Sequence, residues 1–153
     1  MQKSNEEKPV ERLSLDEQKN IMKAIYSYIN SNILVNGELQ FETLDKDGTS
    51  IGLFSEPGAR YLEKNIMGDY KGLVPFTLHY RSNPTTDEMR LRMVDEINDL
   101  TEWIEKNADN VKLALNRTVE KIEGLTTPYL SQADDAGNIT YTVNFNFIYR
   151  KEC

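Results

Sequence analysis

The chain has 153 residues, 39% hydrophobic and 28% charged, a composition typical of one globular domain. Its net charge of −7 argues against a protein that grips nucleic acid, because phosphate binding requires clustered Lys and Arg. No apolar run approaches the roughly 18 residues that span a bilayer, and the polar segment 1–12 lacks the apolar stretch of a secretory signal, so we expect a cytoplasmic protein without a membrane partner.

A capping box at 14–17 (SLDE) predicts that the single domain, 14–153, begins with a helix after a flexible N-terminal leader, 1–13. Ser14 can accept from the first-turn amides, and Glu17 can reach back toward it. Apolar residues then recur mostly at steps of three and four, the pattern of a helix with one buried face. They are Leu15, Ile21, Met22, Ile25, Tyr28 and Ile29. Turn-forming residues follow, so the helix should span about 15–30.

Two hairpins are predicted after this helix. In the first, residues 39–44 and 49–54 flank a polar connection, 45–48 (DKDG), with Gly48 at the turn. Asp45 and Asp47 also look like the start of a calcium-binding loop, but the later oxygen ligands of such a loop are missing. Turn formation therefore explains the segment better.

The second hairpin joins 59–67 to 71–81 through 68–70 (GDY). Its longer strand alternates, with an apolar face of Val74, Phe76, Leu78 and Tyr80 and a polar face of Thr77, His79 and Arg81. His79 is the only histidine, and a general base needs a nucleophile or an orienting acid within reach. On the polar face of a strand we interpret it as structural or solvated.

The second helix has the strongest signal in the sequence. Pro84 precedes it, and Thr85 with Glu88 forms a second capping box. Its apolar residues step by four, four, three and four; they are Met89, Met93, Ile97, Leu100 and Ile104. Trp103 lies beside this stripe, either as a core rim residue or as an interface anchor. The segment that follows, 107–117, fits either a helix or a strand.

The rest of the chain forms a last hairpin. Residues 118–132 are predicted as an irregular, bent strand, because Pro128 fits a strand only at an edge or a bulge. After a polar loop at 133–138, the strand 139–150 alternates, with Thr and Asn on its wet face; its apolar face holds Ile139, Tyr141, Val143, Phe145, Phe147 and Tyr149. The predicted fold is α+β: a single domain with an antiparallel or mixed sheet of hairpins and two helices packed on one face.

The inventory of reactive residues predicts no catalytic, cofactor-binding or metal site. The single cysteine, the terminal Cys153, excludes an intramolecular disulfide and a cysteine-based zinc site, and with one histidine we expect no nucleophilic triad. Carboxylates are plentiful, so a small carboxylate-dependent enzyme stays open as an alternative to a protein that is not an enzyme.

Several runs together resemble the tail terminator proteins of long-tailed phages and prophages of Gram-positive bacteria, which are also labelled minor capsid or head–tail joining proteins. The runs are 73–82 (LVPFTLHYRS), 85–90 (TTDEMR), 100–105 (LTEWIE), 119–122 (VEKI), 127–130 (TPYL), 135–141 (DAGNITY) and 145–149 (FNFIY). The resemblance covers nearly the whole chain from Leu15 onward.

This resemblance implies a structural assembly protein of the virion, located at the head–tail junction after assembly in the host cytoplasm. Its subunits would form a ring, expected to be a hexamer, that caps the head-proximal end of the tail tube and stops its polymerisation. The implied partners are other copies of the chain, the tail tube protein and a neck or head-completion protein. DNA would pass through the acidic lumen without specific binding. The alternative within this class is a neck protein that closes the head.

Hairpin tips and exposed apolar residues are the expected subunit contacts. They are Leu53, Phe54, Met67 and Tyr70. For Leu53 and Phe54 the alternative is that both are ordinary core residues of a strand.

Overall fold

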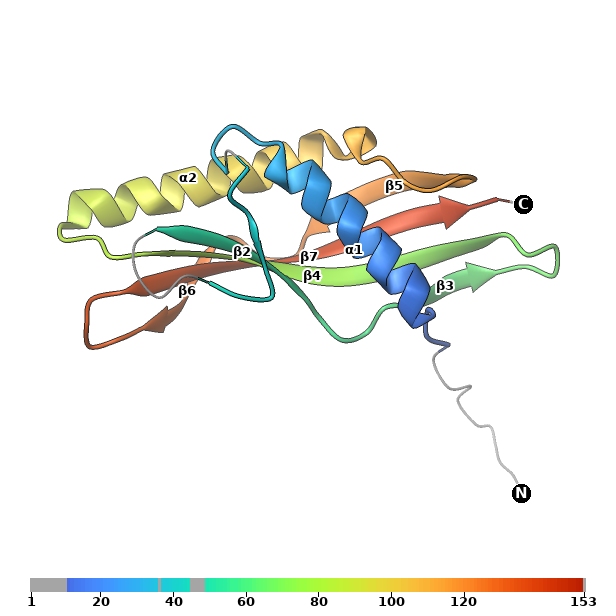
Figure 1. Ribbon diagram of the computed structural model, residues 1–153, viewed down its shortest axis with the longest axis horizontal. Coiled ribbons are helices and arrows are strands. Elements are labelled where there is room, and N and C mark those ends of the chain that lie inside the picture. Colours follow the sequence, from blue (N-terminus) through green and yellow to red (C-terminus); the bar gives the residue numbers. More distant parts are fainter. Residues whose placement is uncertain (1–10, 36, 45–48, 153) are drawn as a thin grey trace, which may run out of the picture.

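In the computed structural model, which describes residues 11–35, 37–44 and 49–152, two long antiparallel strands form the centre of the fold. They are β4 (Tyr70–Ser82) and β7 (Ile139–Lys151), each of 13 residues. Their register runs from Tyr70 opposite Lys151 to Ser82 opposite Ile139 without a shift. The ribbon follows the long axis of the molecule (Figure 1). The alternation of both strands in the sequence is therefore confirmed as the basis of the sheet.

Shorter strands flank this ribbon on both sides. Strands β2 (Ser50–Ser55) and β3 (Arg60–Lys64) pair with successive parts of β4. Strands β5 (Arg117–Gly124) and β6 (Tyr129–Ala133) pair in the same way with β7. The segment predicted as one bent strand is thus two strands on a single edge. The break between them contains Pro128, which has no amide hydrogen to donate.

The first predicted hairpin is wrong. Strand β1 (Gln40–Phe41) pairs with β2 in parallel, Gln40 opposite Gly52, which makes the sheet mixed. The chain crosses β2 instead of reversing beside it, because Gly52 leaves room: a Cβ there would lie 2.6 Å from the Thr43 carbonyl oxygen and 2.9 Å from Leu44 Cδ2. The connection 45–48, with its calcium-loop and turn interpretations, lies outside the described residues.

The first helix, α1 (Leu15–Asn30), has the predicted bounds. The Ser14 hydroxyl accepts from the amide of Glu17 at 3.2 Å, so half of the expected capping box forms. The other half does not, because the Glu17 carboxylate binds Arg117 instead. Residues 11–13 are paired with the sheet: Arg12 bridges to Arg60, and Leu13 is buried.

The N-cap of the second helix, α2 (Asp87–Lys106), lies one residue later than predicted. Thr86, and not Thr85, is the N-cap, and its hydroxyl accepts from the amide of Met89 at 3.2 Å. The ambiguous segment after α2 is a short 3-10 turn, η1 (Ala108–Asn110), followed by chain without regular structure up to β5.

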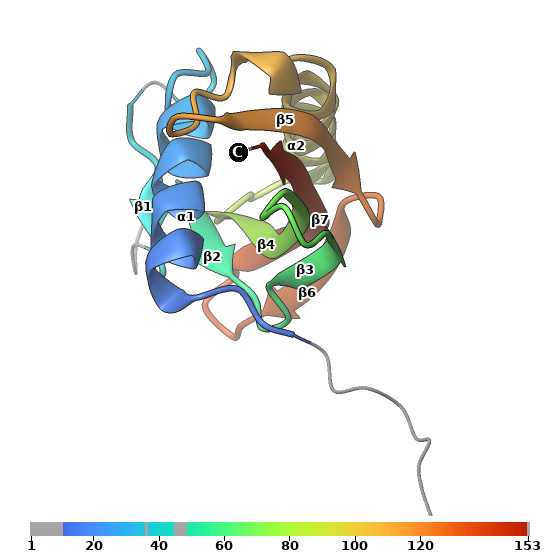
Figure 2. The ribbon, with the colours of Figure 1, turned by 90° about the vertical axis from the view of Figure 1, so that its right-hand side faces the viewer.

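Both helices cover one face of a curved sheet, as predicted (Figures 1 and 2). One continuous core lies between the helices and the sheet. Its largest fully buried side chains are Tyr149, Phe76, Phe145, Phe147, Ile21, Ile25, Ile29, Leu53, Leu78, Ile97, Leu100 and Ile104. The face of β7 that was predicted to be exposed to solvent is partly buried. Thr140 and Thr142 are 2% and 3% exposed, because neighbouring side chains such as His79 and Ser131 cover Thr142.

Candidate functional site

A buried polar cluster fastens the first turn of α1 to the sheet, with the Glu17 carboxylate at its centre. Arg117 donates to both oxygens, from Nη2 to Oε1 at 2.8 Å and from Nε to Oε2 at 2.9 Å. The hydroxyls of Tyr70 and Tyr149 each donate to Oε2 at 2.6 Å. The side chains of Glu17 and Arg117 are only 11% and 18% exposed. One carboxylate therefore joins α1 to β4, β5 and β7.

The hydrogen bonds in this cluster hold Glu17 in its ionised form. Burial by itself raises the pKa of Glu17, but the hydrogen bonds from Arg117, Tyr149 and Tyr70 outweigh it and lower the pKa from 4.5 to about 2. Burial and the bond to this carboxylate raise the pKa of Tyr149. A general acid or base works best with a pKa near the working pH. The cluster is therefore suited to fastening and not to proton transfer.

His79 lies on the face of the sheet opposite the helices and is held between two hydroxyls. Its Nε2 lies 3.2 Å from Thr77 Oγ1, and its Nδ1 lies 3.2 Å from Thr142 Oγ1. Burial lowers its pKa, and the charge of Glu56 offsets this only in part. No carboxylate of the described residues is hydrogen-bonded to the ring; Glu56 reaches it only through Thr77. The imidazole thus bridges β4 and β7 as a neutral side chain.

The described ranges, 11–35, 37–44 and 49–152, contain neither a metal-binding cluster nor a helix able to span a membrane. Within these ranges, no three His, Cys, Asp or Glu side chains gather closely enough to hold a metal ion. None of the helices in the same ranges combines the length and apolar character that crossing a membrane requires. Cys153 lies outside the described residues.

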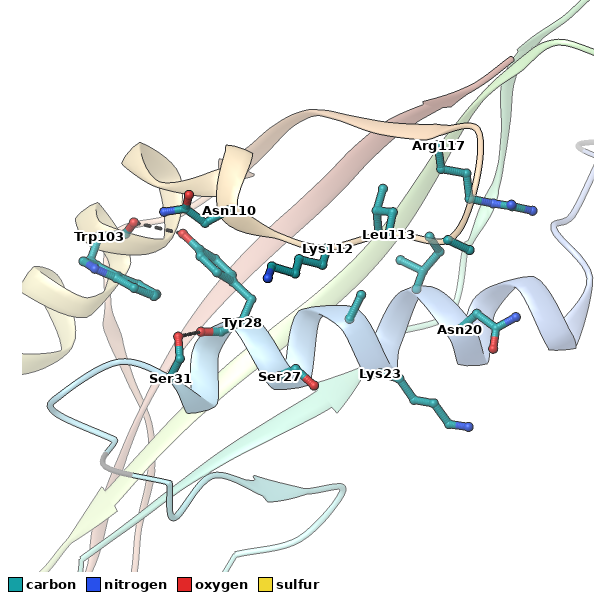
Figure 3. A pocket seen from close by; sticks show the side chains of 13 residues that line it. Asn20, Lys23, Ser27, Tyr28, Ser31, Trp103, Asn110, Lys112, Leu113 and Arg117 are labelled. Carbon is teal, nitrogen blue, oxygen red and sulfur yellow. Dashed lines mark hydrogen bonds between the residues drawn. The ribbon is translucent and has the colours of Figure 1, made fainter. Parts of the chain in front are cut away.

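A hollow of about 700 Å³ separates α1 from the segment that leads into β5 (Figure 3). Tyr28 closes one end: its ring stacks on Trp103, with centroids 4.7 Å apart, and its hydroxyl donates to the Trp103 carbonyl at 3.1 Å. Trp103 is therefore a rim residue of the core. The same hollow is bordered by Lys23 from α1 and by Lys112 from the opposite segment.

A second hollow, of about 830 Å³, lies on the other side of α1, against β1, β2 and β4. Its lining is mainly apolar and includes Met22, Tyr26, Phe41, Ala59 and Val74. Lys19, Lys23 and Leu15 of α1 also border it. The exposed side of α1 is thus a ridge between two hollows, a shape that offers room to another element.

The predicted contact residues differ in their accessibility. Leu53 has no exposed surface and lies on the helix-facing side of β2, opposite Leu78, so it belongs to the core and not to a subunit contact. Phe54 points to the other face, where its ring meets His79 with centroids 4.5 Å apart. Met67, in the turn between β3 and β4, is 75% exposed. For Phe54, Met67 and Tyr70, subunit contact stays a prediction.

Other apolar side chains are more exposed than the sequence pattern indicates. Leu15, assigned to the buried stripe of α1, is 65% exposed, because it lies at the margin of that stripe, six residues before Ile21. Leu91, between two arginines of α2, is 67% exposed, and Ile66 at the β3–β4 turn is fully exposed. On the edge strand β6, Leu130 is 53% exposed. Apolar groups thus reach the surface at several separate places.

Comparison with solved structures identifies a likeness in fold. A chain of the virion of a native gene transfer agent particle matches with a TM-score of 0.62, covering 90% of this chain and 99% of that chain at 11% identity. The two chains share a fold. A second solved structure aligns over 92% of this chain and 97% of its own at 13% identity, but its TM-score of 0.39 is too low to indicate a shared fold. No protein-family model and no curated protein matches the chain.

Proposed function

We propose that the chain is a structural subunit of a phage or phage-like particle, and that it acts there as a tail terminator. In this role its copies form a ring, expected to be a hexamer, that caps the head-proximal end of the tail tube and stops its polymerisation. The observation that carries the proposal is the fold likeness to a virion chain, which extends over 90% of this chain and 99% of that one.

The sequence resemblance supports the same role from a separate direction. Its runs fall mainly on β4, α2 and β7, the elements that build the central ribbon and its helical cover, and the others lie on β5 and at the start of β6. Such a ribbon is a stiff frame, and the elements around it expose apolar side chains at separate places: Leu15 on α1, Ile66 in the β3–β4 turn, Leu91 on α2 and Leu130 on β6. A ring subunit needs this combination, because it must contact two neighbours, the tube and the neck.

The charge of the chain suits a ring through which DNA passes. A net charge of −7 per subunit would give the ring an acidic character that repels the phosphate backbone. DNA would then move through the lumen without specific binding.

Two measurements test the proposal. The mass of the purified chain in solution, followed by negative-stain imaging, should reveal closed rings. Particles assembled without the protein should carry tails of uncontrolled length, because nothing ends tube growth. Tails of normal length that fail to join heads would contradict the terminator role and favour the neck alternative. A chain that stays monomeric at every concentration and in the presence of tubes would contradict both.

A substitution at His79 separates an assembly protein from the enzyme alternative. We expect His79→Ala to assemble like the wild type, with a loss of stability of about 1 kcal/mol from the missing hydrogen bonds. Ring formation and thermal unfolding measure the two effects, and His79→Gln, which keeps a polar side chain, is the control. A folded His79→Ala variant that loses a turnover activity present in the wild type would overturn the structural role.

A further inference from the structure

We propose that α1 of one copy docks alongside α2 of the next copy, and that this helix pair joins neighbouring subunits. The inference rests on the proposed ring and names the surfaces that would build it. It is argued from the exposed charges of the two helices, from their spacing and from the hollow beside α1.

Two lysines on the exposed side of α1 have no salt bridge to any of the residues that the structure describes. Lys19 and Lys23 are exposed, and neither forms a salt bridge with a described residue. They are four residues apart, so they lie one turn above each other on the same face. Two like charges at this spacing destabilise an isolated helix. A partner with negative charges would remove this repulsion.

The outer side of α2 has the opposite charge. Asp95 and Asp99 are exposed, are also four residues apart, and have no salt bridge within the described chain. They present the same unfavourable repulsion with the opposite sign. The two lysines of α1 and the two aspartates of α2 therefore complement each other, on a chain whose net charge of −7 makes an exposed pair of unpaired lysines uncommon.

The match extends beyond these two pairs. When Lys19 is set beside Asp95 with both helices running in the same direction, Lys23 falls beside Asp99, since the spacing is identical. The same alignment places Asp16 beside Arg92, so a third charge meets its opposite. One residue earlier it places Leu15, 65% exposed, beside Leu91, 67% exposed.

The hollow beside α1 offers the space for such a partner. Leu15, Lys19 and Lys23 all border the 830 Å³ hollow, whose lining is mainly apolar. Exposed ion pairs contribute little to affinity, about 0–1 kcal/mol each, but they select the partner and fix the register. Burial of Leu91 and Leu15 against the apolar lining would supply most of the favourable free energy.

The geometry favours a ring over a closed pair. The two surfaces are different parts of one molecule, and in Figures 1 and 2 both helices lie outside the sheet with their outer sides free of other elements. A contact between two different surfaces is head-to-tail, and each subunit can make it twice. Such contacts produce a ring when the rotation closes. A second copy is therefore the occupant that also completes the assembly.

Charge reversal tests the pairing. The variant K19E/K23E, with both helices acidic, and the variant D95K/D99K, with both basic, should each lose rings, with self-association weakened on the order of 100-fold. An equal mixture of the two should form alternating rings, and the fourfold variant that carries both changes should form rings by itself. All four positions are exposed, so thermal unfolding should resemble the wild type. The control, K121E/R150E, changes the net charge as much as K19E/K23E at exposed sites on β5 and β7, away from the contact, and should keep its rings.

The outcomes separate this inference from the function on which it rests. If the wild type forms rings and both reversed variants form them too, the helix pairing is overturned while the ring remains. The same holds if the reversed variants lose their rings and the mixture does not restore them. Reversed variants that still form rings but no longer cap tubes would also overturn it and would assign the surface to the tube protein. A wild type that never forms rings would overturn the proposed function itself.

Discussion

Replacing Arg117 with Met is expected to lower the free energy of unfolding by about 3 kcal/mol, because it leaves the Glu17 carboxylate buried without its counter-charge. In the wild type Arg117 supplies two of the four hydrogen bonds to that carboxylate. Met keeps most of the length and apolar contact of the side chain, so the variant isolates the loss of charge. Chemical denaturation with urea measures the change.

The double variant E17Q/R117M is the matched control. It removes both charges and leaves a neutral amide that still accepts from Tyr70 and Tyr149, so it should recover a large part of the lost stability. Equal losses in the single and double variants would show that the Arg117 contacts matter through packing alone. A loss below about 0.5 kcal/mol in R117M would contradict the fastening role of the cluster.

The same cluster makes stability depend on pH. The pKa of Glu17 is about 2 in the folded chain and 4.5 as its ordinary value. Because the folded pKa is the lower one, this stabilisation is complete above about pH 5 and is lost as the pH falls toward 2. The difference corresponds to about 3 kcal/mol. The variant E17Q should show a flatter decline of unfolding free energy across this range.

The elements that local sequence determines were predicted well. The bounds of α1 follow from Ser14 at its cap and from an apolar stripe that ends before Ser31. The central strands β4 and β7 follow from alternation, since their apolar residues face the helices and have a period of two. These signals depend on neighbours within a few residues, so they can be recognised in the sequence without knowledge of the tertiary structure.

The features that were missed depend on contacts distant in the sequence. Glu17 was expected to complete a capping box with Ser14, but its carboxylate binds Arg117, 100 residues away, which no local pattern reveals. The parallel pairing of β1 was missed because the glycine that permits it, Gly52, looks like any strand glycine until Thr43 lies over it.

The candidate surfaces were harder to predict than the fold. Leu53 and Leu91 both lie inside regular elements, β2 and α2, yet the first is fully buried and the second is 67% exposed. Whether each leucine is buried or exposed depends on which face of its strand or helix it occupies. The matching charges of α1 and α2 were present in the sequence, but their exposure became visible only once both helices had been placed.

Replacing Gly72 with Ala is expected to lower the free energy of unfolding by about 3 kcal/mol. Gly72 lies directly opposite Tyr149 in the β4–β7 register, and the tyrosine ring covers it. An added Cβ would lie 2.6 Å from Tyr149 Cε1 and 2.8 Å from Cζ, closer than van der Waals contact allows. The ring cannot move aside, because it is fully buried and its hydroxyl is bound to Glu17. Thermal or urea unfolding of G72A measures the loss.

A second strand glycine offers the control. At Gly124 the one close neighbour of an added Cβ is the end of the flexible Glu105 side chain, at 3.0 Å, while Phe145 Cε1 at 3.7 Å is an ordinary contact, so G124A should change stability by less than about 0.5 kcal/mol. In a Tyr149→Ala background the space above Gly72 is open, and G72A should then cost far less than in the wild type. If G72A is equally costly with and without the tyrosine, the clash is not the cause, and the strand itself would have to require glycine at this position.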